Sequence, residues 1–161
     1  MGVTVLELED SVVVQRINPL RKTHVKTMPY PGFPTDMQPQ MSTLLCLAEG
    51  TSTITEGVWD NRFGYVDELA KMGALIRVIG RTAIIEGMPF FSGAPIKASD
   101  LRAGAALVIA GLCAQGETEI EGVSYIERGY EKMIGKLSSL GADIQVRYIP
   151  DDTPVSIKDV G

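Results

Sequence analysis

A long segment of the chain occurs twice, and this duplication limits the available folds more than any other feature of the sequence. Residues 36–50 and 100–116 both begin at an aspartate that follows a threonine or a serine, and both end in Ala-Glu-Gly or Ala-Gln-Gly. The copies stay in register as far as Gly73 and Gly141, where small insertions have raised their offset from 64 residues (100 − 36) to 68 (141 − 73). The chain therefore contains two periods of one supersecondary unit, at about 36–99 and 100–148.

Each period has the pattern of a βαβαββ unit or a close relative of it. In the first copy, apolar residues recur at helical spacing over 36–49 and 62–72, and Gly50 and Gly73 follow as helix-terminating residues. Alternating and β-branched residues predict strands between and after these helices, at 51–57, 74–79, 82–87 and 95–98. Helices and strands that alternate in repeated units predict an α/β protein (α+β in some schemes) built from packed layers.

The helical spacing also predicts which side chains are buried and how the first helix begins. Thr35 or Asp36 supplies an N-cap oxygen, and Pro39 falls in the first turn, where the missing N–H group costs nothing. Cys46 and Cys113, late in the two equivalent helices, are expected to pack as small apolar residues. The predicted inward face of the first helix consists of Met37, Met41, Leu44, Leu45 and Ala48, and that of the second consists of Tyr65, Val66, Leu69 and Met72.

The composition argues against several classes of function. Twenty Asp and Glu residues against fifteen Lys and Arg give a net charge of −5, which disfavours general binding to nucleic acid or to an anionic membrane. The longest apolar stretch, 105–110, is too short to span a bilayer, and the first residues lack the pattern of a signal peptide. Two cysteines build no disulfide framework and favour a reducing cytoplasm. With His24 as the only histidine, we expect no metal site and no cofactor.

The repeat places equivalent charged residues at equivalent points of the two copies. Asp36 and Asp100 each open a first helix, and Arg102 follows in the first turn of the second copy. Arg62 and Arg128 each stand at the start of a second helix. Helix N-termini attract anions, and the planar guanidinium group binds phosphate or carboxylate through two N–H groups, so neighbouring copies would form an anion pocket. The structural alternative is that the aspartates only cap helices and the arginines are exposed charges.

Four longer motifs follow one another in register between about residue 3 and residue 147, at 30–40, 59–63, 99–107 and 126–130. In these motifs the chain resembles the enolpyruvyl transferase family, and within it the UDP-N-acetylglucosamine 1-carboxyvinyltransferases more than the sister 5-enolpyruvylshikimate-3-phosphate synthases. The resemblance implies two similar domains, each an inside-out α/β barrel of three βαβαββ units with helix N-termini at the cleft between the domains. It implies that residues 1–149 form about two of the three units of the second domain, followed by a polar tail at 150–161.

The resemblance also implies a reaction and a set of site residues. The family transfers the enolpyruvyl group of phosphoenolpyruvate to the 3′-hydroxyl group of UDP-N-acetylglucosamine, by addition and then elimination of phosphate, which opens peptidoglycan precursor synthesis. Matched by motif, Asp36 is the general base, or a proton relay, for that hydroxyl group. Arg102 and Arg128 bind the phosphate and carboxylate of phosphoenolpyruvate, and Arg62 joins that cluster. The remaining substrate-binding residues are Val58, which contacts the nucleotide sugar through its backbone, Trp59 beside it, and Asp100.

Two catalytic groups of the family, a lysine that binds phosphoenolpyruvate and a proton-donating cysteine, belong to the first domain and have no counterpart in this sequence. The chain is therefore expected to be a fragment that is inactive alone, with the N-terminal domain as its partner. Loss of one unit should expose an apolar face and a strand edge and so favour self-association. Two alternatives stay open: a stand-alone half-domain that binds a UDP-sugar or an anion or acts as an interaction module, and the sister synthase activity.

Overall fold

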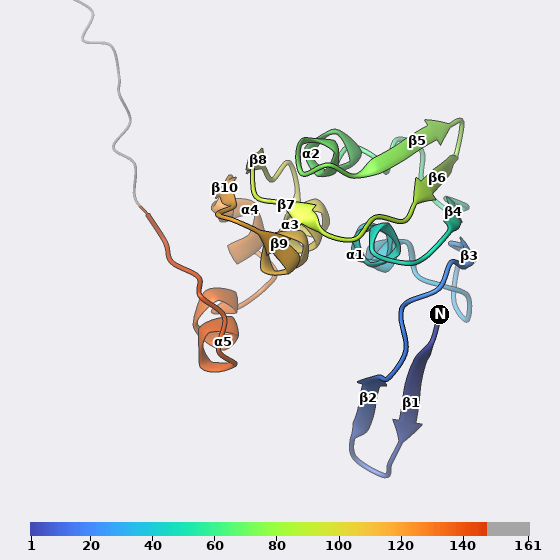
Figure 1. The fold of residues 1–161 in the computed structure, drawn as a ribbon, viewed down its shortest axis with the longest axis horizontal. Helices are drawn as coiled ribbons and strands as arrows, with labels where there is room; N and C mark the ends of the chain where they lie inside the picture. The colour runs from blue at the N-terminus through green and yellow to red at the C-terminus, as the bar shows by residue number, and fades with distance from the viewer. Residues whose placement is uncertain (148–161) are drawn as a thin grey trace, which may run out of the picture. The chain divides into compact units, whose positions relative to one another are not determined.

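A four-stranded mixed sheet combines three strands of the first period with one strand that precedes it in the chain (Figure 1). In spatial order its strands are β3 (His24–Lys26), β4 (Thr51–Thr55), β6 (Thr82–Glu86) and β5 (Leu75–Ile79). The computed structural model describes residues 1–147. In it β3 and β4 are parallel, whereas β6 is antiparallel to both β4 and β5. The hairpin of β5 and β6 turns at Gly80, whose φ of 57° lies in the left-handed region that glycine adopts without strain.

Two helices pack on this sheet, α1 (Gln38–Cys46) and α2 (Val66–Lys71), and a third, α3 (Leu101–Cys113), packs against both of them. A 3₁₀ turn, η1 (Thr35–Met37), leads into α1. α1 contacts α3 and β6, and α2 contacts β5 and α3. The core takes fully buried side chains from the helices and the central strands, and burial of each contributes about 1.5–3 kcal/mol. Among these side chains are Leu45, Ile54, Leu69, Ile85 and Leu107.

Two short parallel pairs join the end of the first period to the second. β7 (Phe91–Ser92) pairs with β9 (Ala114–Gln115), and β8 (Pro95–Lys97) pairs with β10 (Glu119–Glu121). Because α3 lies between β8 and β10 in the chain, these three elements form a βαβ crossover. α4 (Val123–Glu127) follows β10 and contacts α3. Because α1 contacts α3, the equivalent helices of the two periods lie side by side.

An antiparallel hairpin of β1 (Val3–Glu7) and β2 (Val12–Arg16) opens the chain. Every residue of its two strands except Val3 is exposed, although most of them are apolar. Val5 and Val14 face each other across the hairpin and are 58% and 65% exposed. A two-stranded hairpin without a covering layer is marginally stable in water, so this surface is suited to burial against another layer.

The chain divides into a first compact unit, Met1–Glu131, and a second that begins at Lys132. The described part of the second unit contains α5 (Met133–Ser139), which is followed by Gly141 at φ 95°. The predicted boundary between 149 and 150 and the polar tail at 150–161 lie outside the described residues and stay predictions. Each helix in the described range falls short of the length and apolar character that crossing a membrane requires.

The buried face predicted for α1 is wrong in part. Of the five apolar residues predicted to face inward, only Leu45 and Ala48 are fully buried, and Met37 is exposed. Polar side chains, among them Gln38 and Ser42, are buried instead. α1 lies between α3 and β6 and is covered on more than one side, so a single apolar stripe does not describe its packing.

The second helix is shorter than predicted, since α2 begins at Val66 rather than at residue 62. Cys46 is buried as predicted, and burial raises the pKa of its thiol to about 12. Cys113 is exposed, so the packing role predicted for it is wrong: it is the last residue of α3, where the chain passes into β9. The side chains predicted to face inward from the second helix are all buried: Tyr65, Val66, Leu69 and Met72.

Candidate functional site

Asp36 lies between two arginines that come from different periods of the repeat. Asp36 is in η1, Arg62 precedes α2, and Arg102 is in the first turn of α3. Arg102 binds the carboxylate through two N–H groups: Nε donates to Oδ1, and Nη2 donates to Oδ2 over 2.9 Å. Arg62 Nη2 also donates to Oδ1, over 3.2 Å. The structure therefore brings three of the sequence-predicted site residues into one ion-paired cluster.

The cluster is held together by charge and remains open to solvent. The hydrogen bond from Arg102 lowers the pKa of Asp36, partial burial opposes this, and the positive charges of Arg102 and Arg62 lower the pKa further. The same hydrogen bond raises the pKa of Arg102. The Asp36 side chain is 55% exposed, so a phosphate or carboxylate could reach the guanidinium groups that it binds. Among residues 1–147, no three His, Cys, Asp or Glu side chains gather as a metal site.

The two aspartates that open equivalent helices have different contacts. Asp100 Oδ1 accepts hydrogen bonds from two backbone N–H groups in the first turn of α3, over 2.8 and 3.0 Å, and so caps that helix. The N-cap residue of α1 is Met37, and its side chain makes no capping bond. The N-cap predicted at Thr35 or Asp36 is therefore wrong. Both side chains are turned toward charged partners, which bind them more strongly than a backbone N–H group would.

Arg128 takes part in a different contact. It is the C-cap residue of α4, so its predicted place at the start of a helix is wrong: a short helix follows β10 where the first copy has a loop. Its guanidinium carbon lies 5.3 Å from the ring centroid of Tyr125, in cation–π range. The hydroxyl group of Tyr130 accepts a hydrogen bond from Gln40 Nε2 over 3.4 Å. This segment therefore lies against the helix that follows Asp36.

The loop after β4 carries two further predicted site residues, Val58 and Trp59. Their backbone N–H groups donate to the same carboxylate oxygen of Glu56, over 2.9 and 3.1 Å. Both side chains are exposed. The guanidinium carbon of Arg62 lies 5.9 Å from the centroid of the Trp59 ring. The loop therefore brings Arg62 close to Trp59 as well as to Asp36.

Glu56, which is not among the sequence-predicted site residues, holds this loop in place. Its side chain is 1% exposed, and the hydroxyl groups of Thr27 and Thr35 donate to it over 2.7 and 3.0 Å. Burial raises the pKa of this carboxyl group, but the hydrogen bonds outweigh it, so the pKa of Glu56 lies below its usual value. The strand pattern could have indicated this role. Alternation along the strand places Ser52, Ile54 and Glu56 on one buried face, and a buried carboxylate needs several hydrogen-bond donors.

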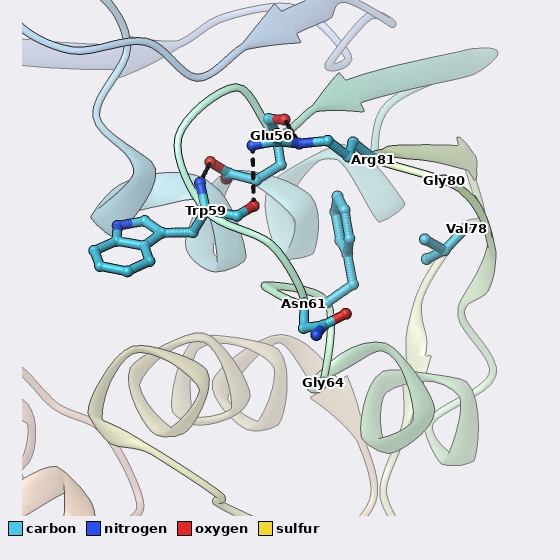
Figure 2. A pocket seen from close by; sticks show the side chains of 8 residues that line it. Glu56, Trp59, Asn61, Gly64, Val78, Gly80 and Arg81 are labelled. Atoms are coloured by element: carbon cyan, nitrogen blue, oxygen red, sulfur yellow. Dashed lines mark hydrogen bonds between the residues drawn. The ribbon is translucent and has the colours of Figure 1, made fainter.

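A hollow of about 290 Å³ adjoins the same loop (Figure 2). Arg81 fixes the loop beside it: Nε donates to the carbonyl oxygen of Glu56 over 2.8 Å, and Nη2 to that of Trp59 over 3.3 Å. Figure 2 shows that the indole ring of Trp59 points away from the hollow. The charged groups at the hollow are thus already engaged, and its remaining lining consists mainly of apolar and glycine residues, including Phe63, Gly64, Val78 and Gly80.

Curated relatives match this chain over most of its length. It is 58% identical over 144 residues to the UDP-N-acetylglucosamine 1-carboxyvinyltransferase of Clostridium botulinum, with 89% of this chain and 34% of the relative covered. It is 60% identical over 146 residues to the UDP-N-acetylglucosamine 1-carboxyvinyltransferase 3 of Symbiobacterium thermophilum, with 90% and 34% covered. It is 54% identical over 153 residues to the UDP-N-acetylglucosamine 1-carboxyvinyltransferase of Desulfofundulus thermocisternus, with 95% of this chain and 63% of the relative covered. The chain thus spans about a third of the length of the first two relatives.

Solved structures confirm the expected fold class. The enolpyruvyl transferase NikO from Streptomyces tendae matches with a TM-score of 0.82 and 35% identity, over 90% of this chain and 34% of that chain. EPSP synthase from Acinetobacter baumannii shares the fold, with a TM-score of 0.63 and 18% identity over 91% of this chain and 35% of that chain. The family model described as EPSP synthase (3-phosphoshikimate 1-carboxyvinyltransferase) matches residues 1–137. The chain, whose motifs resemble enolpyruvyl transferases, therefore belongs to the EPSP synthase (3-phosphoshikimate 1-carboxyvinyltransferase) family.

Proposed function

We propose that this chain forms part of the active site of an enzyme that transfers the enolpyruvyl group of phosphoenolpyruvate to the 3′-hydroxyl group of UDP-N-acetylglucosamine. The observation that carries the proposal is the Asp36 carboxylate held between the guanidinium groups of Arg62 and Arg102. An acceptor hydroxyl group needs a base, and an anionic donor substrate needs positive groups beside that base. Relatives that are 54–60% identical to this chain are named for this transfer.

The ion pairs of Asp36 suggest how the base becomes active. An incoming phosphate or carboxylate group competes with Asp36 for the N–H groups of Arg102 and Arg62. Once these N–H groups bind the substrate, they no longer hold the pKa of Asp36 down, and its affinity for a proton rises. In this proposal, binding of phosphoenolpyruvate prepares Asp36 to accept the proton of the sugar hydroxyl group.

The addition step forms a bond between the sugar 3′-oxygen and C2 of phosphoenolpyruvate. The hydroxyl proton passes to Asp36, and C3 gains a proton from a group of the N-terminal domain that is the proposed partner. Elimination then removes a proton from C3 and breaks the bond between C2 and the phosphate oxygen, which leaves with the electron pair. Arg102, with Arg62 and Arg128, neutralises the charge on the departing phosphate. Val58 and Trp59 border the nucleotide sugar, and Asp100 positions Arg102 by capping α3.

Titration of the chain with each substrate tests this proposal. We expect UDP-N-acetylglucosamine and phosphoenolpyruvate to bind separately with dissociation constants of about 1 mM, as weak partial sites do. Because the family's lysine and cysteine have no counterpart in this sequence, the chain alone should release no phosphate above the blank when both substrates are present. Calorimetry and a coupled phosphate assay measure the two quantities.

Shikimate 3-phosphate serves as the control acceptor in the same titrations. Binding of shikimate 3-phosphate in place of the UDP-sugar would favour the sister activity. If neither acceptor bound and phosphoenolpyruvate did not bind, the proposal would be wrong and an interaction module would be the better account. Robust phosphate release by the chain alone would contradict the proposed need for the N-terminal domain.

The exposed apolar hairpin of β1 and β2 leads to a second prediction, that the isolated chain associates with itself. We expect sedimentation at tens of micromolar to show species larger than a monomer, because apolar surface of this kind is buried by association. Replacing Val5 and Val14 together with lysine should restore a monomer. Gln15→Lys, which adds charge at a polar position of the same strand, is the control and should leave association unchanged. A wild-type chain that sediments as a clean monomer would contradict this prediction.

The proposed reaction also suggests a place in the cell. UDP-sugars and phosphoenolpyruvate are soluble phosphorylated metabolites, and the two cysteines build no disulfide framework. We therefore place the protein in the cytoplasm, where its product would feed cell wall biogenesis and so support cell shape and division.

A further inference from the structure

Glu56 is a buried carboxylate that binds groups from three separate segments of the chain. We infer that it is a positioning residue of the Asp36 site: through the hydroxyl group of Thr35, it fixes the guanidinium group of Arg62 on Asp36. The inference rests on the proposed function only for the identity of the substrate that binds there. The hydrogen bonds that support the inference are all between residues of this chain and involve no ligand.

The hydrogen bonds between these groups can run in only one direction. A guanidinium group has donors and no acceptor, and a carboxylate has acceptors and no donor. The Thr35 hydroxyl oxygen lies 3.3 Å from Nε of Arg62 and 3.0 Å from Oε2 of Glu56. It must therefore accept a hydrogen bond from Arg62 and donate one to Glu56. Without an acceptor at position 56, the Thr35 hydroxyl hydrogen has no partner and its orientation is lost.

This directed pair of hydrogen bonds determines how Arg62 meets Asp36. Arg62 uses Nε for Thr35 and Nη2 for Asp36, so two points fix the planar guanidinium group. Thr35 is also the residue before Asp36 in the chain, so its hydrogen bond to Glu56 holds the backbone that carries the proposed base. A side chain fixed in this way has less rotamer freedom to lose when a ligand binds.

The other oxygen of Glu56 fixes the loop that contains Arg62. Oε1 accepts from the N–H groups of Val58 and Trp59 and from the Thr27 hydroxyl group, over 2.9, 3.1 and 2.7 Å. The Thr27 hydroxyl group in turn accepts from the N–H group of Gly57, over 2.8 Å. Both oxygens of the Glu56 carboxylate therefore accept hydrogen bonds. The neutral amide of a glutamine could not replace it, because one of the two polar atoms of an amide is itself a donor.

Four variants of the chain test this inference without any substrate. Thr35→Val removes the hydroxyl group with little change of shape, and Glu56→Gln removes the charge and turns a donor toward Thr35. Thr35→Ser keeps the hydroxyl group and should behave like the wild type. Thr27→Val is the control for general loosening: it removes hydrogen bonds that hold the same loop, but it leaves the bonds of Thr35 to Glu56 and to Arg62 in place.

The readout is the rate at which the Nε–H proton of Arg62 exchanges with water, measured by NMR, together with thermal unfolding. Thr35→Val and Glu56→Gln should speed this exchange about tenfold, as expected when a charge-assisted hydrogen-bond chain is broken. Thr35→Ser should restore the wild-type rate. Thr27→Val should lower the melting temperature but keep the exchange of Arg62 within about twofold of the wild type.

Equal exchange rates in the wild type, Thr35→Val and Glu56→Gln would overturn the inference. It would also be overturned if Thr27→Val sped exchange as much as Thr35→Val, because the effect would then reflect general loosening. Since the protein alone is measured, the result is separate from the proposed reaction. Slow wild-type exchange that responds to Thr35 and Glu56, combined with no binding of either substrate, would contradict the reaction and support the role of Glu56.

Discussion

Replacing Gly57 with alanine is expected to lower the free energy of unfolding by about 3 kcal/mol, because there is no space for a methyl group at this position. A Cβ atom at Gly57 would lie 2.2 Å from the carbonyl oxygen of Thr27. The two residues cannot simply move apart. The Gly57 N–H group donates to the Thr27 hydroxyl group over 2.8 Å, and the Thr27 N–H group donates to the carbonyl oxygen of Thr55 over 2.9 Å. The added methyl group must therefore break hydrogen bonds that hold the loop of Val58 and Trp59.

Gly64→Ala is the matched control, because this glycine lies further along the same loop, and apart from its chain neighbours no described residue has an atom within 4 Å of its Cβ position. We expect it to change stability by less than about 0.5 kcal/mol, or to raise it slightly by restricting the unfolded chain. Urea unfolding followed by the fluorescence of Trp59, the only tryptophan, measures both variants. A Gly57→Ala chain as stable as the wild type would show that the loop does not press against Thr27 as described.

Features of the fold that depend on a few neighbouring residues could be predicted from the sequence. Gly73 directly follows Met72, the C-cap residue of α2, with a φ of 93° that other residues adopt only at a cost. The stop predicted at Gly50 is wrong in position: α1 ends at Cys46, and Gly50 immediately precedes β4, with a φ of 92°. The hairpin around Gly80 was predicted from the alternation of the strands on either side of it. These signals are local, because each arises from backbone geometry or from the side-chain period of a single element.

Packing between distant elements could not be predicted from periodicity. The Ser42 hydroxyl group is buried against the Tyr65 hydroxyl group, 2.6 Å away, and the Thr43 hydroxyl group lies 3.4 Å from the carbonyl oxygen of Ala106 in α3, to which it donates. A hydropathy pattern places such residues on the surface, yet each is buried with a partner. The Tyr65 partner comes from outside α1, and only the folded chain brings it there.

The contacts between the candidate site residues could be predicted in part, for a reason that lies in the repeat. Asp36, Arg62 and Arg102 meet because α1 and α3 are equivalent helices that pack side by side. Arg128 was misplaced because the second copy departs from the first after β10, so equivalence by sequence offset no longer holds there. Glu56 makes its contacts through Thr27 and Thr35, which come from an earlier strand and loop, and no spacing rule connects them.

Arg102→Ala is expected to weaken binding of phosphoenolpyruvate about 10- to 100-fold, whereas Asp36→Asn should tighten it about fivefold. Arg102 presents Nε and Nη2 in one plane, and both donate to Asp36. Removing this fork removes a bidentate, charge-assisted contact with the anion. In the proposed site, Asp36 would compete for the same N–H groups and its negative charge would repel phosphoenolpyruvate, whereas asparagine has nearly the same shape without the charge. Two substitutions within one ion pair should therefore change affinity in opposite directions.

Calorimetric titration with phosphoenolpyruvate separates this specific competition from a general effect of net charge. It compares the wild type, Arg102→Ala and Asp36→Asn with a control variant, Arg77→Ala. Arg77→Ala removes the same charge from an exposed position on β5 and should change the dissociation constant by less than about twofold, because solvent and salt screen distant charges. If only net charge mattered, Arg77→Ala and Arg102→Ala would weaken binding equally. If Asp36 served mainly to orient Arg102, its neutralisation would weaken binding too, and the competition proposed for the activation of the base would be wrong. Tighter binding by Asp36→Asn and weaker binding by Arg102→Ala are expected together only if the carboxylate occupies the position that the substrate anion takes.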